Sequence, residues 1–411
     1  MFNFMSKTIT PLYFRGYLYL WIGMVAVGIA TMMQMTARGY LAYELTNSAS
    51  KLTYVNVAFA FPMLSLSLFG GALSDRLDKQ KIIQIGQFSA AFLAFIIAAL
   101  IFSDYINWLH LLTVSFVQGG IWAFMVPSRH AFIAELVPGK NLNSAIALNS
   151  AGFNVSNLIA PAVAGLIYGL AGPGYVYTII GGLALMGVFF TFIIKPEMRQ
   201  SNDIPDNNQS EKKEILSEIK IGLIYIYNEK LLFSLLIASL IFSLLAEPFR
   251  FLLPIFVKDI YLRGPEAMGL LTTLMGLGSV IASIIIAGID ANKRGLIWII
   301  GGFITGGCLL ALAISDSYVI SMIVMVFMGA SDSIRRTLSM SIMMEKTRPD
   351  LRGRIMSIYM LNWGLIPLGA LPAGIVADII GAQSTIGILS ILLLISSALV
   401  LITQKELRTV N

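Results

Sequence analysis

Long, mostly uncharged apolar stretches alternate with short polar segments along the whole chain. Each stretch holds about 20 residues, enough for an α-helix to cross the roughly 30 Å hydrocarbon core of a bilayer. The pattern predicts twelve transmembrane helices, at residues 16–40, 53–73, 82–102, 108–128, 144–170, 175–194, 231–257, 267–289, 296–314, 318–335, 355–377 and 385–403. The expected fold is therefore an all-α polytopic membrane protein.

One long polar segment divides these helices into two sets of six. Its first part, residues 201–210, has the composition of a disordered segment, and the charged run 211–214 predicts the start of an amphipathic helix. We therefore expect an N-terminal six-helix domain over residues 1–194, a cytoplasmic linker over 195–230 and a C-terminal six-helix domain over 231–411.

The two sets of helices carry traces of an internal repeat. With an offset of 209 residues, Gly165 falls opposite Gly374, and Gly172 falls opposite Gly381. Parallel repeats of this kind build the two halves of many secondary transporters. The sequence thus predicts two six-helix pseudo-repeats.

Composition supports a membrane protein and argues against other classes. Hydrophobic residues make up 57% of the chain and charged residues 12%, which is too apolar for a soluble domain of this length. The net charge of +6 comes from loop residues and not from one basic patch, so nucleic acid is not expected as a partner. A single cysteine, Cys308, excludes a disulfide framework, and His110 and His130 lie at opposite ends of one expected helix. With no nucleotide-binding loop and no catalytic grouping, we expect no metal, no cofactor and no enzymatic activity.

The distribution of lysine and arginine predicts the orientation in the membrane. If the N-terminus is cytoplasmic, nearly all of the 28 basic residues lie on the cytoplasmic side. The five exceptions are Arg38, Lys51, Arg250, Lys258 and Arg263. Both termini and the long linker are therefore expected inside the cell.

Charged residues within two expected helices are candidates for a transport cavity. Gln34 and Arg38 are four residues apart and share one helix face, while Glu247 and Arg250 lie in residues 231–257. Charges at membrane depth usually face a cavity and mark a pathway. Glu247 lies about 24 Å along its helix at 1.5 Å per residue, so it is our candidate for the proton-carrying acid. The alternative is that Glu247 and Arg250 form only an ion pair near the outer interface.

A second acid, Asp332, is expected close to the end of the helix at 318–335, beside Arg335 and Arg336. Its simplest interpretation is a salt bridge at the helix end. If Glu247 does not carry the coupling proton, Asp332 is the alternative.

Small residues spaced four apart predict a flat packing face on the helix at 144–170. Proline removes one backbone hydrogen bond and kinks a helix, so a kink is expected in the same region. The residues concerned are Gly152, Ser156, Ala160, Pro161 and Gly165. The pattern resembles the signature G-x3-G-P-x2-G-G of antiporters, with Ser and Ala in place of most glycines, and ordinary helix packing is an equal alternative.

The charged segment between the second and third expected helices resembles the G-x-L-x-D-R-x-G-R-K signature of the major facilitator superfamily. The matching residues are Gly71, Leu73, Asp75, Arg76 and Lys79. Asp78 stands where that family usually has glycine, so the turn differs here. The resemblance implies twelve helices in two six-helix halves that rock about a mid-membrane site.

Two further segments resemble a bacterial branch of that superfamily, which holds the enterobactin exporter and macrolide efflux proteins. They are residues 129–150 and 351–357. This resemblance implies a monomeric inner-membrane exporter of a bulky organic small molecule, of siderophore or drug type, driven by protons. In such proteins the acid of the loop motif meets a base and a helix start on the cytoplasmic side. Here that inner gate would comprise Gly71, Asp75, Arg76 and Arg129.

Other functions remain open on the same fold. Arg38 and Arg250 would suit an anion, which allows an importer of an organic anion or another nutrient, or a lysolipid flippase. A transport-inactive sensor or scaffold is a further alternative from another class.

Overall fold

The computed structural model describes residues 9–74, 77–199, 215–287, 293–348 and 351–410, and within these ranges all regular structure is helical. The α-helices are α2 (Arg15–Thr46), α3 (Ala49–Val57), α4 (Ala60–Ser74), α5 (Lys79–Phe102), α6 (Trp108–Leu136), α7 (Leu142–Ala171), α8 (Pro173–Ile193), α9 (Ile215–Asn228), α10 (Lys230–Ala246), α11 (Pro248–Ile255), α12 (Pro265–Ala287), α13 (Arg294–Ile314), α14 (Tyr318–Lys346), α15 (Arg352–Ile380), α16 (Ala382–Thr403) and α17 (Lys405–Thr409). Short 3-10 helices cover Thr10–Tyr13, Gly139–Asn141 and Pro196–Met198, and a π-helical turn covers Phe256–Ile260.

Ten helices of the described chain are long and apolar enough to cross a membrane. The all-α membrane fold expected from hydropathy is therefore confirmed, while the count of twelve stays a prediction. Of the other two expected helices, residues 355–377 lie within α15, whose apolar portion is Leu365–Ile380. The expected helix at 53–73 is not continuous and is divided into α3 and α4.

Proline explains the division between α3 and α4. Pro62 has no N–H to donate to the carbonyl of Ala58, so the regular hydrogen-bond pattern is interrupted there. At this point Gly119 of α6 approaches so closely that a Cβ on it would lie 2.0 Å from the carbonyl oxygen of Phe59. Only glycine allows the two backbones to come this near.

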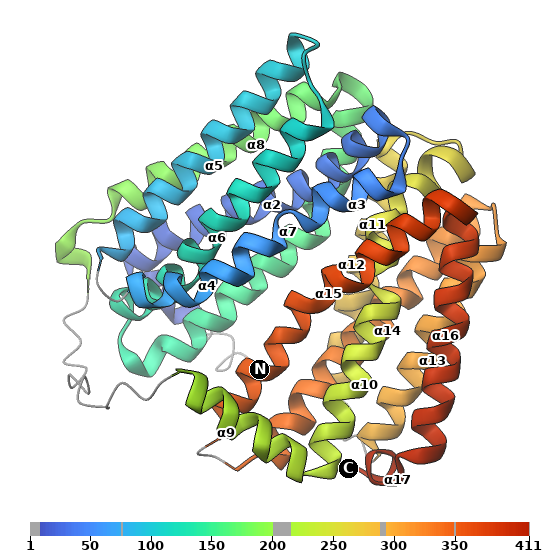
Figure 1. Ribbon diagram of the computed structural model, residues 1–411. Helices are drawn as coiled ribbons and strands as arrows, with labels where there is room; N and C mark the ends of the chain where they lie inside the picture. The colour runs from blue at the N-terminus through green and yellow to red at the C-terminus, as the bar shows by residue number, and fades with distance from the viewer. Residues whose placement is uncertain (1–8, 75–76, 200–214, 288–292, 349–350, 411) are drawn as a thin grey trace. The chain divides into compact units, whose positions relative to one another are not determined.

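The chain divides into two compact units, and unit 1 comprises Met1–Asn47, Tyr54–Pro205 and Arg263–Thr273. In unit 1, α2 packs against α7 and α8, α5 lies alongside α8, and α4 lies alongside α6 (Figure 1). Part of its core is built around Tyr17 of α2, which is fully buried and donates its hydroxyl to the carbonyl of Ala145 at 2.7 Å.

Unit 2 comprises Ser48–Thr53, Asp206–Leu262 and Leu274–Asn411. Here α13 packs against α14 and α16, and α10 packs against α15 and α16 (Figure 1). The helix expected in the linker is α9, which contacts α15 and α10. Ile226 of α9 is almost completely buried, so this part of the linker is packed and not only solvated. The domain boundaries given above remain a prediction.

Gly172 and Gly381 have almost the same backbone conformation. Their φ and ψ angles are 92° and 169° at Gly172, and 87° and 155° at Gly381. Each ends one long helix and begins the next, α7 to α8 in the first case and α15 to α16 in the second. A positive φ of this size strains any residue other than glycine. This local correspondence supports the proposed repeat.

One expected boundary was wrong in a way that matters for the site. The helix expected to end at Arg335 continues to Lys346. Asp332, Arg335 and Arg336 therefore lie in the middle of α14 and not at its end.

Candidate functional site

Glu247 lies at a break between α10 and α11. Its backbone N–H still donates to the carbonyl of Ser243 at 3.1 Å, but the next residue, Pro248, cannot donate to the carbonyl of Leu244. Gly369 of α15 packs against this break, because a Cβ on it would lie 2.4 Å from the Leu244 carbonyl oxygen. The sequence thus places the acid at a local interruption, supported by a close contact with a second helix.

Glu247 belongs to a ring of four alternating charges in unit 2. Its two carboxylate oxygens contact Arg250 Nε at 2.9 Å and Arg336 Nη2 at 2.8 Å. On the opposite side, Asp332 Oδ2 lies 3.0 Å from both Arg250 Nη2 and Arg336 Nη2. Arg336 Nε also donates to Asp332 Oδ1 at 3.1 Å. Each acid therefore shares both arginines with the other acid.

This ring combines the two interpretations proposed for Glu247 and Asp332. The ion pair between Glu247 and Arg250 is present, as is the pair between Asp332 and a base of its own helix. The helix-end setting expected for Asp332 is absent, because α14 continues beyond it. The sequence reasoning missed Arg336 as the residue that joins the two acids.

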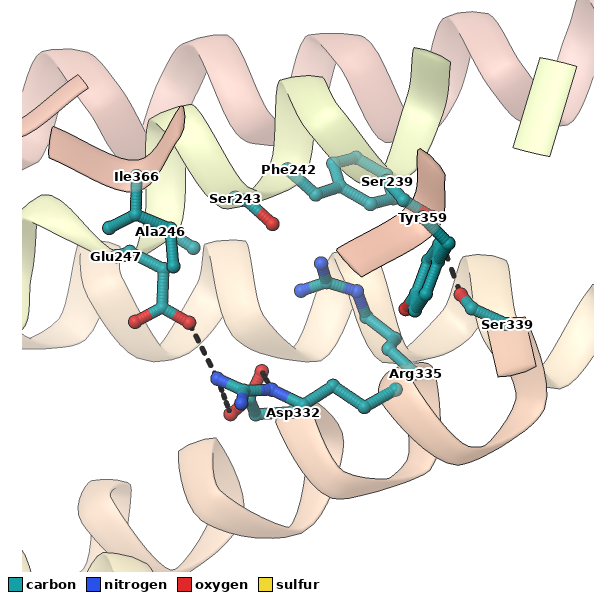
Figure 2. Close-up of a pocket in the computed structure, with 11 residues that line it drawn as sticks. Ser239, Phe242, Ser243, Ala246, Glu247, Asp332, Arg335, Ser339, Tyr359 and Ile366 are labelled. Carbon is teal, nitrogen blue, oxygen red and sulfur yellow. Dashed lines mark hydrogen bonds and ion pairs between the residues drawn. The ribbon is translucent and has the colours of Figure 1, made fainter. Parts of the chain in front are cut away.

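A small cavity adjoins the ring, with about 30 Å³ of space open to water, enough for one or two molecules. Figure 2 shows Glu247 and Asp332 on one side of it, Ser239, Ser339 and Tyr359 on the other, and Arg335 between them. All of these residues belong to unit 2.

Arg335 is 7% exposed and is held mainly by aromatic rings. Its guanidinium carbon lies 4.6 Å from the ring centre of Phe242 and 5.9 Å from that of Trp298. Stacking of this kind stabilises a buried arginine without an acid in direct contact. A polar network lies next to it, in which Trp298 donates to Ser339 at 2.7 Å and Ser339 is 3.3 Å from Ser239.

Unit 1 holds the other two residues predicted for the cavity, Gln34 and Arg38 of α2. They are 7% and 6% exposed. Gln118 of α6 donates to Gln34 Oε1 at 2.7 Å, and Arg38 interacts electrostatically with Tyr177 of α8. The structure thus places Gln34 and Arg38 together in unit 1, and Glu247 and Arg250 together in unit 2.

The small residues predicted for packing form one buried face of α7. Its five members, Gly152, Ser156, Ala160, Pro161 and Gly165, are all buried. A Cβ on Gly152 would lie 2.8 Å from Val25, and one on Gly165 would lie 2.5 Å from the carbonyl oxygen of Pro265. Within unit 1 this face therefore packs on α2 and on the first turn of α12. The kink at Pro161 remains a prediction.

Half of the predicted inner gate lies outside the described residues. Asp75 and Arg76 lie in the range that the structure does not describe, and Gly71 is part of α4. Arg129 lies in α6, and its Nε atom has no hydrogen-bond partner among the described residues. The gate assignment therefore stays a prediction.

A neighbouring charge network was not expected from the sequence. Asp78 caps α5 by accepting a hydrogen bond from the N–H of Gln80 at 3.0 Å, and it contacts Arg199 at 3.3 Å. Lys79 contacts Glu135 of α6 at 2.8 Å. The aspartate in place of the usual glycine thus serves as a helix cap. Among the described residues, no group of three or more metal-binding side chains occurs.

Comparison with known families identifies the chain. The family model of transmembrane secretion effectors, within the major facilitator superfamily, matches residues 6–410. The chain belongs to this family. It is thus a multi-pass membrane transporter of a bacterial family and not an enzyme, as expected from the sequence.

Relatives of this transporter include efflux-type proteins. The chain is 24% identical to the staphyloferrin A transporter of Staphylococcus aureus, over 84% of this chain and 85% of the relative. It is 23% identical to macrolide efflux protein A of Streptococcus pyogenes, over 95% and 96% of the two chains.

Solved transporter structures share the fold. A bacterial homologue of the human lysosomal transporter Spinster has a TM-score of 0.74 at 13% identity, over 96% of each chain. The nucleoside transporter NupG has a TM-score of 0.70 at 13% identity, over 95% of this chain and 99% of that one. At these identities the likeness concerns the fold alone.

Proposed function

We propose that the transporter exports a bulky organic small molecule of siderophore or drug type, and that protons drive it. The substrate classes named for the two relatives support an efflux role of this kind. Two six-helix halves, residues 1–194 and 231–411, would rock about a mid-membrane site in a monomer, with both termini cytoplasmic. The matched conformations of Gly172 and Gly381 and the excess of basic residues in the expected inner loops support this arrangement.

The single observation that carries the coupling proposal is the charge ring of Glu247, Arg250, Asp332 and Arg336. With both acids ionised, the ring is neutral. A proton on Glu247 would weaken two ion pairs at once, those to Arg250 Nε and Arg336 Nη2, and leave both arginines on Asp332. The ring would then carry one excess positive charge beside a cavity large enough for water.

Protonation of one acid in such a ring can change how the helices that carry the ring pack against each other. Glu247 comes from the break between α10 and α11, while Asp332 and Arg336 come from α14. Weakening the contacts between these helices in one protonation state, and restoring them in the other, would favour different helix arrangements. A coupling site requires this kind of difference between states.

The substrate and direction are tested in two steps. A deletion strain is first grown with macrolides and under iron limitation. The compound to which the strain's sensitivity changes is then offered to inside-out vesicles with an acidic interior. Uptake driven by the gradient supports proton-coupled export. Uptake only into right-side-out vesicles would support import instead.

An importer of an organic anion or other nutrient, or a lysolipid flippase, is the second candidate. The observation that favours an anionic substrate is the burial of Arg38 in unit 1 without an acidic partner in the ion pairs described there. The vesicle experiment separates the two candidates by direction.

A further inference from the structure

Arg38 lies in the interior of unit 1 with its charge uncompensated. Only 6% of the residue is exposed, and its Nε atom has no hydrogen-bond partner in the part of the chain that the structure describes. The ion pairs among the described residues of unit 1 join Lys79 and Arg199 to acids and do not include Arg38. Burying a charge without a partner is costly, so such a residue normally has a counter-ion for at least part of its working cycle.

Other polar side chains on α2 and on the helices that pack against it also have buried atoms without a hydrogen-bond partner among the described residues. Among the described residues of unit 1, six more buried side-chain atoms have no hydrogen-bond partner, and three of them are relevant here: Nε2 of Gln34, Oγ of Ser115 and Oη of Tyr177. Gln34 precedes Arg38 by one turn of α2, and Tyr177 of α8 interacts electrostatically with Arg38. Ser115 precedes Gln118, the residue that bonds Gln34, by one turn of α6. These polar groups thus come from α2 and from the two helices α6 and α8, both of which pack against α2.

The chemistry of these groups selects the ligand. Arg38 can only donate, the free atom of Gln34 is an amide nitrogen, and the hydroxyls of Ser115 and Tyr177 can donate. A carboxylate has two oxygens with about four acceptor positions, which matches four donors. A basic or neutral ligand would leave the arginine charge buried and unpaired. An acid would satisfy all of these groups together.

We propose that Gln34, Arg38, Ser115 and Tyr177 form a binding site for a carboxylate group of the transported molecule. The cargo is then an organic acid, and this inference rests on the proposed transport function because it specifies the substrate of that function. Arg38 forms the charge-assisted bonds, and the other three donors orient the carboxylate. In the unloaded protein the arginine destabilises unit 1, and the ligand removes that cost.

Thermal melting of the purified full-length protein in a neutral detergent tests the site. The probe is tricarballylate, and its trimethyl ester is the uncharged control. Binding to the folded state raises the melting temperature by mass action. Tricarballylate should raise the melting temperature of the wild type and the ester should not. Anionic phosphatidylglycerol micelles form a separate arm, to separate a lipid headgroup from a substrate acid.

Substitutions assign the effect to these residues. Arg38→Gln should abolish the response to tricarballylate and melt higher than the wild type without ligand, because it removes an unpaired buried charge. Arg38→Lys and Tyr177→Phe should each weaken binding roughly tenfold, the usual scale for a lost bond to a charged group. Arg199→Gln is the matched control, since the Nε atom of Arg199 is also buried without a hydrogen-bond partner among the described residues while its charge is paired with Asp78, and it should leave the probe response unchanged.

The inference is overturned if tricarballylate stabilises Arg38→Gln as much as the wild type, or stabilises neither. It is also overturned if only phosphatidylglycerol gives an Arg38-dependent shift. Transport is judged separately, by gradient-driven uptake into inside-out vesicles. Uptake without the melting response would remove the carboxylate site and leave the exporter proposal intact. A melting response without uptake would keep the carboxylate site and remove the exporter proposal.

Discussion

Arg336 Nη2 lies 2.8 Å from Glu247 Oε1, although the two residues are 89 positions apart in the sequence. The same nitrogen lies 3.0 Å from Asp332 Oδ2. The two acids are therefore linked through one guanidinium group, and a change of charge on one acid alters the surroundings of the other. We therefore expect a proton on Glu247 to change the ion pairs of Asp332 as well.

Arg336 should contribute more to stability than Arg250, although each contacts both acids. Its side chain is 30% exposed against 42% for Arg250, and it makes the additional bond to Asp332 through Nε. We expect Arg336→Gln to lower the free energy of unfolding by about 2 kcal/mol. Arg250→Gln, the matched control, should cost at most about 1 kcal/mol. Melting in detergent measures both variants, and an equal loss would contradict this ranking.

The close approach of Gly369 to the break before Glu247 predicts a second stability effect. In Gly369→Val the added side chain would displace the backbone at Leu244, and we expect a loss of about 1–3 kcal/mol. Gly307 of α13 has nothing within 4 Å of its Cβ position. Gly307→Ala should therefore be neutral or stabilise by up to about 1 kcal/mol. Equal melting temperatures for the two variants would show that the helices separate without cost.

The proposed orientation predicts which side of the membrane each loop faces. In a Cys308→Ser background, Asn208→Cys in the linker should not react with an impermeant thiol reagent on intact cells. Tyr105→Cys is the positive control, because Tyr105 is 76% exposed and lies between the third and fourth expected helices, in a loop that the proposed orientation puts outside the cell. Labelling at position 208 and protection at position 105 would reverse the orientation.

The inner-gate hypothesis predicts different effects for substitutions of the neighbouring residues Asp75 and Asp78. Asp75→Asn should reduce transport roughly tenfold at normal expression, because a charge-assisted bond to Arg129 would be worth about 1.5–3 kcal/mol in the gated state. Asp78→Asn weakens the contact to Arg199 while an amide can still cap α5, so it should lower stability slightly and leave transport per folded molecule unchanged. Normal transport by Asp75→Asn would remove the gate assignment.

Hydropathy predicted most of the helices because each crosses an apolar medium, but it could not find where helices continue through polar residues. The end of α14 was misplaced because Asp332, Arg335 and Arg336 interrupt the apolar run, and their burial depends on partners from α10 and α13. The break between α3 and α4 follows from Pro62, which the sequence contains but the hydropathy pattern does not show.

The candidate site was predictable only in part. The offset between repeats found Gly172 and Gly381, because a positive φ restricts both positions to glycine. The occurrence of charged residues within apolar stretches of the sequence indicated Arg38 and Glu247 as candidates. The link from Glu247 to Arg336 depends on how helices pack, and spacing along one helix cannot reveal it.

The central claim is that Glu247 carries the proton that drives transport. Glu247→Gln keeps the size and hydrogen bonding of the side chain but cannot release a proton. Glu345→Gln is the control, since Glu345 forms its ion pair with Arg294 at a side chain that is 48% exposed. In vesicles loaded with substrate, exchange without a gradient should persist in both variants. Accumulation driven by a pH gradient should fall at least roughly tenfold in Glu247→Gln only, which corresponds to about 1.4 kcal/mol. Undiminished gradient-driven accumulation by Glu247→Gln would contradict the claim and leave Asp332 as the acid to test.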